Sequence, residues 1–222
     1  MTLVRKLLDI ASGPISRTEP SREDLPAGSL GNQLHELLVD RNGFYVFESA
    51  LHVRPAARRT DGAHDISAWN SSELWRHSYQ SLIDDRFCFF AEDAFGHQFA
   101  IDEAHVFSFN SETGGVRVVV DNIEQWASGV LENYRVATGY PVIHAWQAVH
   151  GAIRPGYRLL ARVPFVLGGE YVRENVSAIH DVALMRYWGS FANSIRDLAD
   201  GESFVFDVAG PEDLVRTSAP PP

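Results

Sequence analysis

Residues 87–120 contain four short apolar runs separated by loops, and this pattern constrains the fold more than any other part of the chain. The runs are Phe87–Ala91, His97–Ile101, His105–Phe109 and Val116–Val120. The first loop ends at Gly96 and the last ends at Gly114-Gly115. Loops of this length, with glycine available for a positive φ, close β-hairpins. The sequence therefore predicts a four-stranded antiparallel meander, a kind of sheet that usually buries one face and wets the other.

A helix is predicted directly after the fourth run. Asp121 can accept a hydrogen bond from the backbone N–H near Glu124, and Glu124 can reach back, which is the arrangement of a capping box. Apolar residues then recur at helical spacing, so that one face of this helix packs on the sheet. These residues are Ile123, Trp126, Ala127, Val130, Leu131 and Tyr134. Other predicted elements are helices at 30–42, 72–82, 142–150 and 181–198, a strand ending at Gly168-Gly169, and a strand at 203–208.

The length of 222 residues suits one domain with a sizeable core, and 45% of the residues are hydrophobic. Residues 1–28 are expected to form a short N-terminal helix and a Pro/Gly-rich connector. Residues 29–210 are expected to form a single α+β domain with a C-terminal elaboration, and residues 211–222 a flexible tail.

The formal charge of −10 is concentrated in the centre of the chain. Residues 84–133 hold ten acidic residues and two arginines, a net charge of −8. Direct binding of nucleic acid requires clustered lysine and arginine, so we do not expect it. An acidic segment instead favours a basic partner, which it attracts over a distance. A solvated acidic face that only keeps the protein in solution is the alternative.

The sequence also predicts where the protein works. No apolar run approaches the roughly 20 residues that cross a bilayer, and the first residues do not resemble a secretory signal. Cys88 is the single cysteine, which excludes internal disulfides and suits a reducing compartment. We therefore expect a cytoplasmic protein that does not interact with membranes.

Signatures of catalysis are weak. The chain has no G-x-S-x-G elbow, no P-loop and no G-x-G-x-x-G motif. Cys88 lies between two phenylalanines with acids upstream, and burial beside negative charge raises the pKa of a thiol, so a structural cysteine is expected. The closest approach to a metal site is the set His97, Asp102, Glu103 and His105, whose spacing does not make the ligands converge. We expect no catalytic residue, no metal and no cofactor.

The order of elements resembles the SUKH superfamily. The resemblance rests on GNQLHELLVDRNGFYVF, then FCFFAEDAFGHQFAID, then FSFNSETGGVRVVVDNIEQWASGVLENY, and it covers residues 30–137. It implies an α+β fold in which helices pack against a twisted, mostly antiparallel sheet. Bacterial members of this superfamily are chiefly immunity proteins of polymorphic toxin systems, and the family has no shared catalytic residues. The Gly-rich turn expected near the first strand is reduced here to Asn42-Gly43, and residues 54–66 resemble an insertion.

The resemblance implies that the chain binds and blocks one cognate toxin, often a nuclease, by occluding its active site. Because a nuclease has a basic groove for phosphates, an acidic inhibitor can occupy that groove. We expect exposed hairpin tips and loops to carry the contact. The candidate partner-binding residues are Asp84, Asp85, Glu92, Asp93, Asp102, Glu103 and Glu112.

Two other functions remain open. The first is a regulatory or scaffold protein of the same fold that binds a different cellular partner. The second is a small-molecule or metal-dependent enzyme centred on His97, Asp102 and His105.

Overall fold

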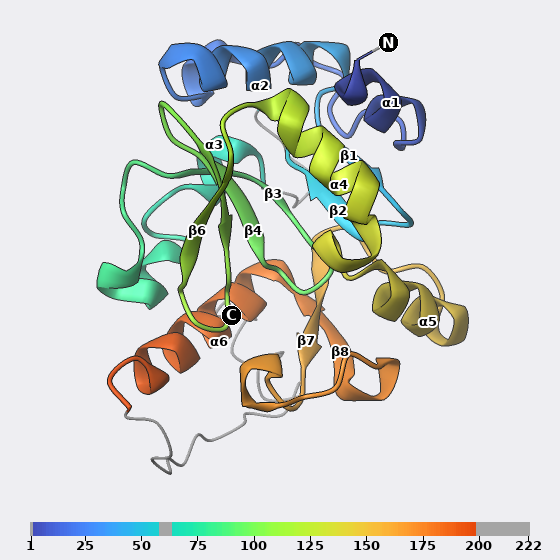
Figure 1. Ribbon diagram of the computed structural model, residues 1–222, viewed down its shortest axis with the longest axis vertical. Helices are drawn as coiled ribbons and strands as arrows, with labels where there is room; N and C mark the ends of the chain where they lie inside the picture. Colours follow the sequence, from blue (N-terminus) through green and yellow to red (C-terminus); the bar gives the residue numbers. More distant parts are fainter. Residues whose placement is uncertain (1, 58–63, 199–222) are drawn as a thin grey trace, which may run out of the picture.

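The computed structural model describes residues 2–57 and 64–198, and its fold is α+β (Figure 1). In the described residues, six strands form one antiparallel sheet in the order β1-β2-β3-β4-β5-β6, and β7 and β8 form a separate hairpin. The strands are β1 Phe44–Val46, β2 Leu51–Val53, β3 Cys88–Glu92, β4 Gln98–Ile101, β5 Val106–Phe109, β6 Val116–Val120, β7 Tyr157–Ala161 and β8 Val176–His180. The predicted fold class is confirmed.

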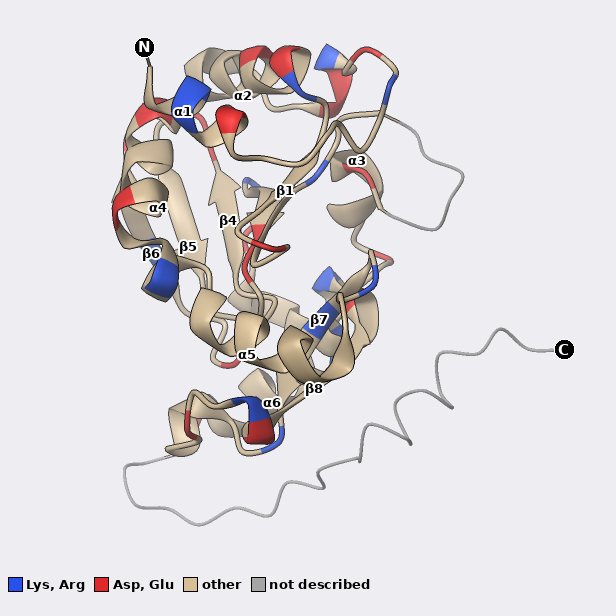
Figure 2. Cartoon of the chain, turned by 90° about the vertical axis from the view of Figure 1, so that its right-hand side faces the viewer, with Lys and Arg blue, Asp and Glu red and all other residues tan. Residues whose placement is uncertain are grey.

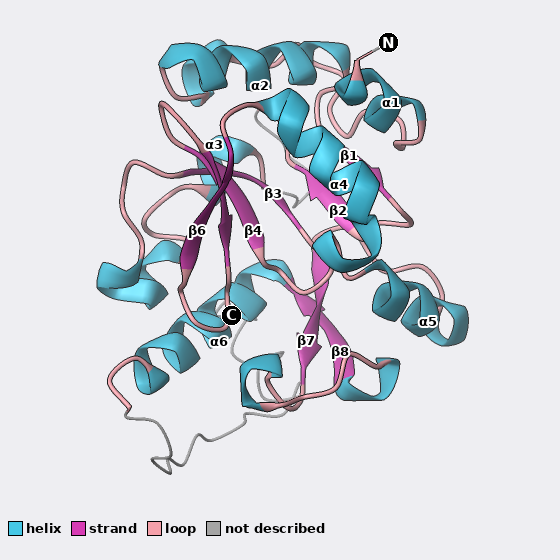
Figure 3. Ribbon diagram, in the orientation of Figure 1, coloured by secondary structure: helices cyan, strands magenta, loops and turns pink. Residues whose placement is uncertain are grey.

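The helices surround this sheet (Figure 3). The α-helices are α1 Leu3–Asp9, α2 Gly28–Asp40, α3 Ile66–Trp69, α4 Ile123–Ala137, α5 Tyr140–His150 and α6 Asp181–Ile195. Short 3₁₀ helices are η1 Arg22–Asp24, η2 Arg76–Leu82, η3 Phe165–Leu167 and η4 Arg173–Asn175. No helix among the described residues is long and apolar enough to cross a membrane.

The four-stranded meander predicted from residues 87–120 is confirmed as β3 to β6. Two further short strands, β1 and β2, extend it through a turn at Phe47, Glu48 and Ser49, each of which has a positive φ. Three non-glycine residues in this conformation are unusual, so this hairpin could not be recognised from turn composition.

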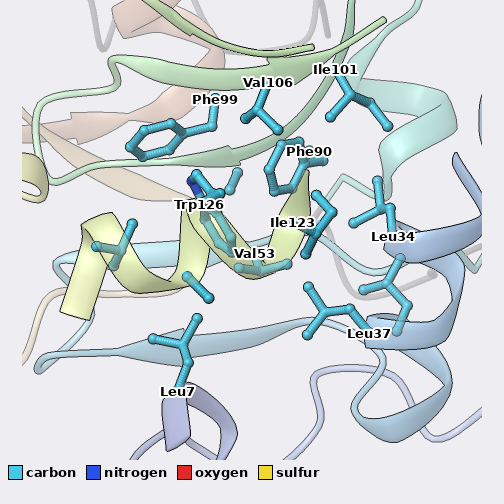
Figure 4. Packing of buried hydrophobic residues seen from close by; sticks show 14 of the residues in the cluster. Leu7, Leu34, Leu37, Val53, Phe90, Phe99, Ile101, Val106, Ile123 and Trp126 are labelled. Carbon is cyan, nitrogen blue, oxygen red and sulfur yellow. The ribbon is translucent and has the colours of Figure 1, made fainter. Parts of the chain in front are cut away.

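The sheet is covered on both faces over most of its width. One face packs against α1, α2 and α4, with Phe90, Phe99 and Trp126 at its centre (Figure 4). The other face packs against α3, η2 and α6 through Phe89, Phe109 and their neighbours. The expectation of one wet face is therefore wrong for β3 and β4, whose residues are buried throughout. Among the described strands of the sheet, β6 at the edge is the one that is largely exposed.

The predicted helix after β6 forms, but its cap differs from the prediction. Asn122, not Asp121, is the N-cap, and its side chain accepts from Gln125 N at 2.8 Å. Glu124 is instead used by a distant segment, because its carboxylate accepts the N–H groups of Leu3 and Val4 at the start of α1. The cap is thus shifted by one residue, and Gln125 takes the part predicted for Glu124, because its side chain accepts from Asp121 N at 3.2 Å.

Several other predicted elements changed. Helices formed near the predicted positions as α2, α5 and α6, whereas residues 72–82 form turns and the 3₁₀ helix η2. The strand predicted to end at Gly168-Gly169 ends earlier, at Ala161, because Pro164 follows and η3 begins. The strand predicted at 203–208 and the tail predicted at 211–222 lie outside the described residues.

Candidate functional site

Three of the seven predicted partner-binding acids are buried, namely Glu92, Asp93 and Glu112, and Glu92 lies in a network of charges. Its side chain is 1% exposed. Glu92 Oε1 lies 2.9 Å from Arg54 Nη2 and 2.9 Å from His52 Nδ1. It also lies 3.0 Å from Arg158 Nε, an ion pair whose N–H is not aligned for a hydrogen bond. Burial opposes ionisation of Glu92, but the two guanidinium groups and the imidazole hold its pKa well below the ordinary value.

The charge network around Glu92 extends across the molecule. Arg54 Nη2 also lies 3.2 Å from Asp181 Oδ2 at the start of α6, and its guanidinium stacks 3.3 Å from the centre of the Trp69 ring. Gln98 completes the enclosure, because it donates to Glu92 Oε2 at 3.1 Å and accepts from Trp69 Nε1 at 3.0 Å. The network therefore joins the main sheet to β7, α3 and α6, and its burial makes it part of the core.

Asp93 and Glu112 lie near the tips of the two predicted hairpins, and both turn inward. Asp93 Oδ1 accepts from Phe95 N at 2.8 Å and from His97 N at 2.9 Å, and burial raises the pKa of this carboxyl. Glu112 accepts from the backbone N–H groups of residues 165 and 166 at 3.0 and 2.8 Å, at the start of η3.

The expectation that Glu92, Asp93 and Glu112 lie on exposed hairpin tips is therefore wrong. The reason is the chain that follows residue 150. The hairpin β7–β8, with η3 and α6, lies against this end of the sheet and covers the tips (Figure 1).

The remaining four acids lie together at the opposite end of the sheet. Asp84 and Asp85 precede β3, and Asp102 and Glu103 follow β4. Antiparallel pairing of Cys88 with Ile101 therefore brings the two segments to the same end of the sheet. Asp84, Asp85 and Glu103 are exposed, and Asp102 is half-buried. We call these four residues the acidic end.

One arginine is placed inside the acidic end. Arg86 Nε lies 3.5 Å from Asp84 Oδ2 and 3.8 Å from Asp102 Oδ2. Asp102 also accepts the N–H groups of residues 104 and 105, so its carboxylate fixes the β4–β5 loop. Asp85 is fully exposed and lies 3.6 Å from Arg76 Nη2, whereas no ion pair of Glu103 is found among the described residues. Acidic residues also lie on α1, α2 and α4 (Figure 2).

The residues of the alternative enzyme site do not converge. His97 precedes β4, whereas Asp102 and His105 follow it, so they lie at opposite ends of the strand. His97 Nδ1 accepts from Ser111 N at 3.1 Å, which places the proton of a neutral imidazole on Nε2. Within residues 2–57 and 64–198, no three His, Cys, Asp or Glu side chains lie together as metal ligands would.

Cys88 is buried, as predicted, and its thiol is a weak acid. Burial raises its pKa to about 12, against the opposing charge of Arg76. Burial alone accounts for the raised pKa, because the charged neighbour in the structure is Arg76, which lowers it, and not one of the acids upstream. A thiol with so little thiolate at neutral pH is a poor nucleophile.

A groove on the α4 side of the sheet was missed by the sequence reasoning. Its volume is about 640 Å³, within the usual range for binding sites. Phe99 and Trp126 form the floor between β4 and α4, and Arg117 and Val119 of β6 line the outer side. Asp93, His97 and Tyr171 close the end that faces β7–β8. In Figure 1 α4 crosses the sheet on the side of β1 to β3 and does not extend over β6.

Exposed apolar residues border this groove. Val136 on the α4 wall is 88% exposed, and Val119 of β6 is 40% exposed. The valine-rich run VRVVV at 116–120 was the available signal, because a strand in which both faces carry valine has no polar side to present to water.

Comparison with known proteins supports the fold but indicates no function. No protein-family profile and no curated protein matches the chain. Among solved structures, the chain is similar to Atu4351 from Agrobacterium tumefaciens, with 12% sequence identity and a TM-score of 0.53. The alignment covers 82% of this chain and 86% of that one.

Proposed function

We propose that the chain is a cytoplasmic immunity protein of the SUKH superfamily that binds a cognate toxin and occludes its active site. The observation that supports this most directly is the acidic end. Four acidic residues from two segments of the chain gather there on a sheet whose other end is buried. An end of a rigid sheet that presents carboxylates suits a basic groove, such as the phosphate-binding groove of a nuclease.

The buried acidic residues and the cysteine are held by contacts within the protein, and this favours a binding function over a catalytic one. Glu92, Asp93 and Glu112 each accept contacts from the protein itself, and Cys88 is buried with a raised pKa. A catalytic acid, base or nucleophile must reach its substrate, and Glu92, Glu112 and Cys88 are enclosed. Asp93 borders the groove beside α4, but one of its carboxylate oxygens already accepts two backbone N–H groups. Their geometry is that of residues that stabilise a fold.

The test is co-expression with the candidate toxin domain encoded by the adjacent gene. The proposal expects rescue of growth and co-purification of the two proteins. It further expects that Asp85→Lys combined with Glu103→Lys weakens binding by more than about tenfold, because like charges then face the toxin. The matched control is Glu132→Lys combined with Glu170→Lys, which changes the net charge equally at exposed sites away from the acidic end.

Two results would contradict the proposal at different levels. Absence of both rescue and co-purification would reject the immunity function. Rescue with equal affinity and equal salt dependence in both double variants would reject the acidic end as the contact surface.

The alternative function is a non-catalytic regulatory or scaffold protein that binds another cellular partner. The groove beside α4 favours this alternative, since it is apolar and lies away from the acidic end. A partner that is retained after the charge reversal at Asp85 and Glu103, but released by Val136→Lys, would support it.

A further inference from the structure

The two edges of the six-stranded sheet differ in how they are covered. Residues 12–16 run beside β1 and the residues before it and form three backbone hydrogen bonds there, including Ser12 N to Tyr45 O and Ile15 N to Gly43 O, both at 2.8 Å. At the opposite edge, β6 pairs with β5 and with no other strand among the described residues. The chain therefore covers one edge itself, and the described residues leave the β6 edge open (Figure 1).

The backbone of β6 presents hydrogen-bonding groups at this open edge. Successive residues of an antiparallel strand point their N–H and C=O groups alternately toward the paired strand and away from it. Gly115 O accepts from Asn110 N at 2.8 Å, so residue 115 points toward β5, and the pairing is regular from residue 116 to residue 118. Arg117 therefore also points its backbone groups toward β5. Those of Val116 and Val118 point outward, where a further strand can bind them.

The side chains of β6 are apolar on both faces of the sheet. Val118 is 51% exposed and is aligned with Phe107, so it lies on the face that packs against η2 and α6. Val119 lines the groove beside α4 on the other face. Proteins commonly protect an open edge with lysine, proline or a bulge, and β6 has a bulge at Val119 but pairs regularly before it. An added strand would thus cover valines with both sets of its alternating side chains.

One end of this open edge lies beside the acidic end. The last residue of β6 is aligned with the first residue of β5, so the residue after β6 lies next to the loop at residues 102–105. That residue is Asp121, whose Oδ1 lies 3.8 Å from Nε2 of His105 and whose side chain is 74% exposed. Asp121 therefore continues the acidic surface to the corner at which the open edge begins.

We propose that the basic partner of the acidic end also adds an extended segment to β6, as a further strand of the sheet. This inference rests on the proposed function and names the part of the partner that binds, an exposed strand or loop with lysine or arginine beside Asp121. Charged groups at an interface chiefly accelerate and orient the encounter. Backbone hydrogen bonds along a sheet edge supply affinity, and the alternate side chains of the added strand supply specificity.

Charge favours a basic partner over a second copy of this chain. Each copy carries a formal charge of −10, so two copies repel each other. Antiparallel pairing of two β6 strands about Val118 would also set the two Arg117 side chains diagonally across from each other on one face. A basic partner avoids both repulsions when its added segment places a neutral or acidic residue beside Arg117.

The first test measures the Kd between the full chain and the toxin domain encoded by the adjacent gene. Val118→Pro removes the outward N–H but no hydrogen bond to β5, and is expected to raise the Kd by more than about tenfold. Val118→Thr is the matched control, because it keeps the N–H and the branched side chain, and should change the Kd by less than about threefold. Circular dichroism of each variant separates loss of binding from loss of structure.

A charge reversal tests the corner of the edge. Asp121→Lys is expected to raise the Kd by more than about fivefold, because a like charge then faces the basic segment. Glu132→Lys makes the same change of net charge on the exposed surface of α4 and is the control. Equal effects of the two variants would reject the basic residue beside Asp121.

The second test follows backbone amide exchange in the unaltered chain by nuclear magnetic resonance. In the free chain, the amide of Val118 should exchange rapidly because it points to solvent, whereas that of Arg117 should exchange slowly because it points to β5. Saturation with the toxin domain should slow exchange at Val116 and Val118 by more than about tenfold. The amide of Arg117 is the internal control and should be slow in both states.

The outcomes separate this inference from the proposed function. A chain that neither rescues growth nor binds the toxin domain would reject both. A complex that forms equally well with Val118→Pro, or that leaves exchange at Val118 rapid, would overturn the inference and leave the proposed function standing. Slow exchange at Val118 in the free chain that becomes rapid on dilution would identify a second copy as the occupant and would also overturn it.

Discussion

Replacement of Glu92 by glutamine should be among the most destabilising conservative changes in this protein. The amide keeps the size of the side chain but removes the charge that compensates Arg54 and Arg158. Arg54 retains Asp181 at 3.2 Å, whereas Arg158 has no other carboxylate within ion-pair distance among the described residues. One guanidinium is therefore left in the core without a counter-charge.

The size of the effect follows from this geometry. Breaking a buried ion pair by removing one partner costs about 3–5 kcal/mol of unfolding free energy, because an uncompensated charge stays buried. Since Arg54 keeps its second carboxylate, we expect the lower end, about 3 kcal/mol. For a chain of this size that loss lowers the melting temperature by about 6–12 °C.

The assay is urea unfolding at pH 7, followed by tryptophan fluorescence and far-ultraviolet circular dichroism. Glu132→Gln on the exposed surface of α4 is the control and should change the unfolding free energy by less than about 0.5 kcal/mol. A loss below about 1 kcal/mol for Glu92→Gln would show that the network does not stabilise the fold as a charged unit.

Three further predictions concern titration, reactivity and backbone conformation. Burial lowers the pKa of His52 to about 3, so below pH 6.5 the unfolded chain binds a proton that the folded chain does not. Unfolding free energy should fall with decreasing pH by up to about 1.4 kcal/mol per unit between pH 6.5 and 3, and His52→Gln should remove this part of the slope in urea titrations. Cys88 should react with a thiol reagent such as dithionitrobenzoate only after denaturation, and labelling of the folded protein within minutes would contradict its burial. Gly96→Ala should cost more than about 1 kcal/mol in thermal unfolding, because φ is +80° and the new Cβ would lie 2.4 Å from Leu184 Cδ2. Gly129→Ala within α4 meets nothing within 4 Å and should stabilise by about 0.5–1 kcal/mol.

Features encoded by neighbouring residues were predictable from the sequence. The loop ending at Gly96 and the loop ending at Gly114-Gly115 close hairpins, because glycine supplies the positive φ that each turn needs. Helix α4 followed from the spacing of its apolar residues. Its cap did not, because Asp121 with Glu124 and Asn122 with Gln125 both have the spacing of a capping box, and the local pattern does not choose between them.

The fate of each acidic residue could not be predicted in this way. Glu92, Asp93 and Glu112 carry the same charges as Asp85 and Glu103 and lie in similar sequence surroundings. Their burial depends on Arg158 and on residues 165–166, which are more than fifty positions away along the chain. Whether a carboxylate is buried or exposed depends on such contacts between residues that are distant in the sequence. Patterns in a single sequence indicate only how neighbouring residues are arranged.

The distinction between the two ends of the sheet changes how the charge of the protein should be understood. Three of the ten acids in residues 84–133 are enclosed, and Glu92 among them is compensated by arginines from β7 and from the residue after β2. Buried, paired charge contributes little to attraction over distances beyond the Debye length, about 8 Å at physiological salt. Steering of a basic partner must therefore come from exposed carboxylates, and in the acidic end those not paired with Arg86 are Glu103 and Asp85, the second of which is fully exposed although it lies 3.6 Å from Arg76 Nη2. For this reason replacement of these two residues should reduce the salt dependence of partner binding, although residues 84–133 contain ten acidic residues.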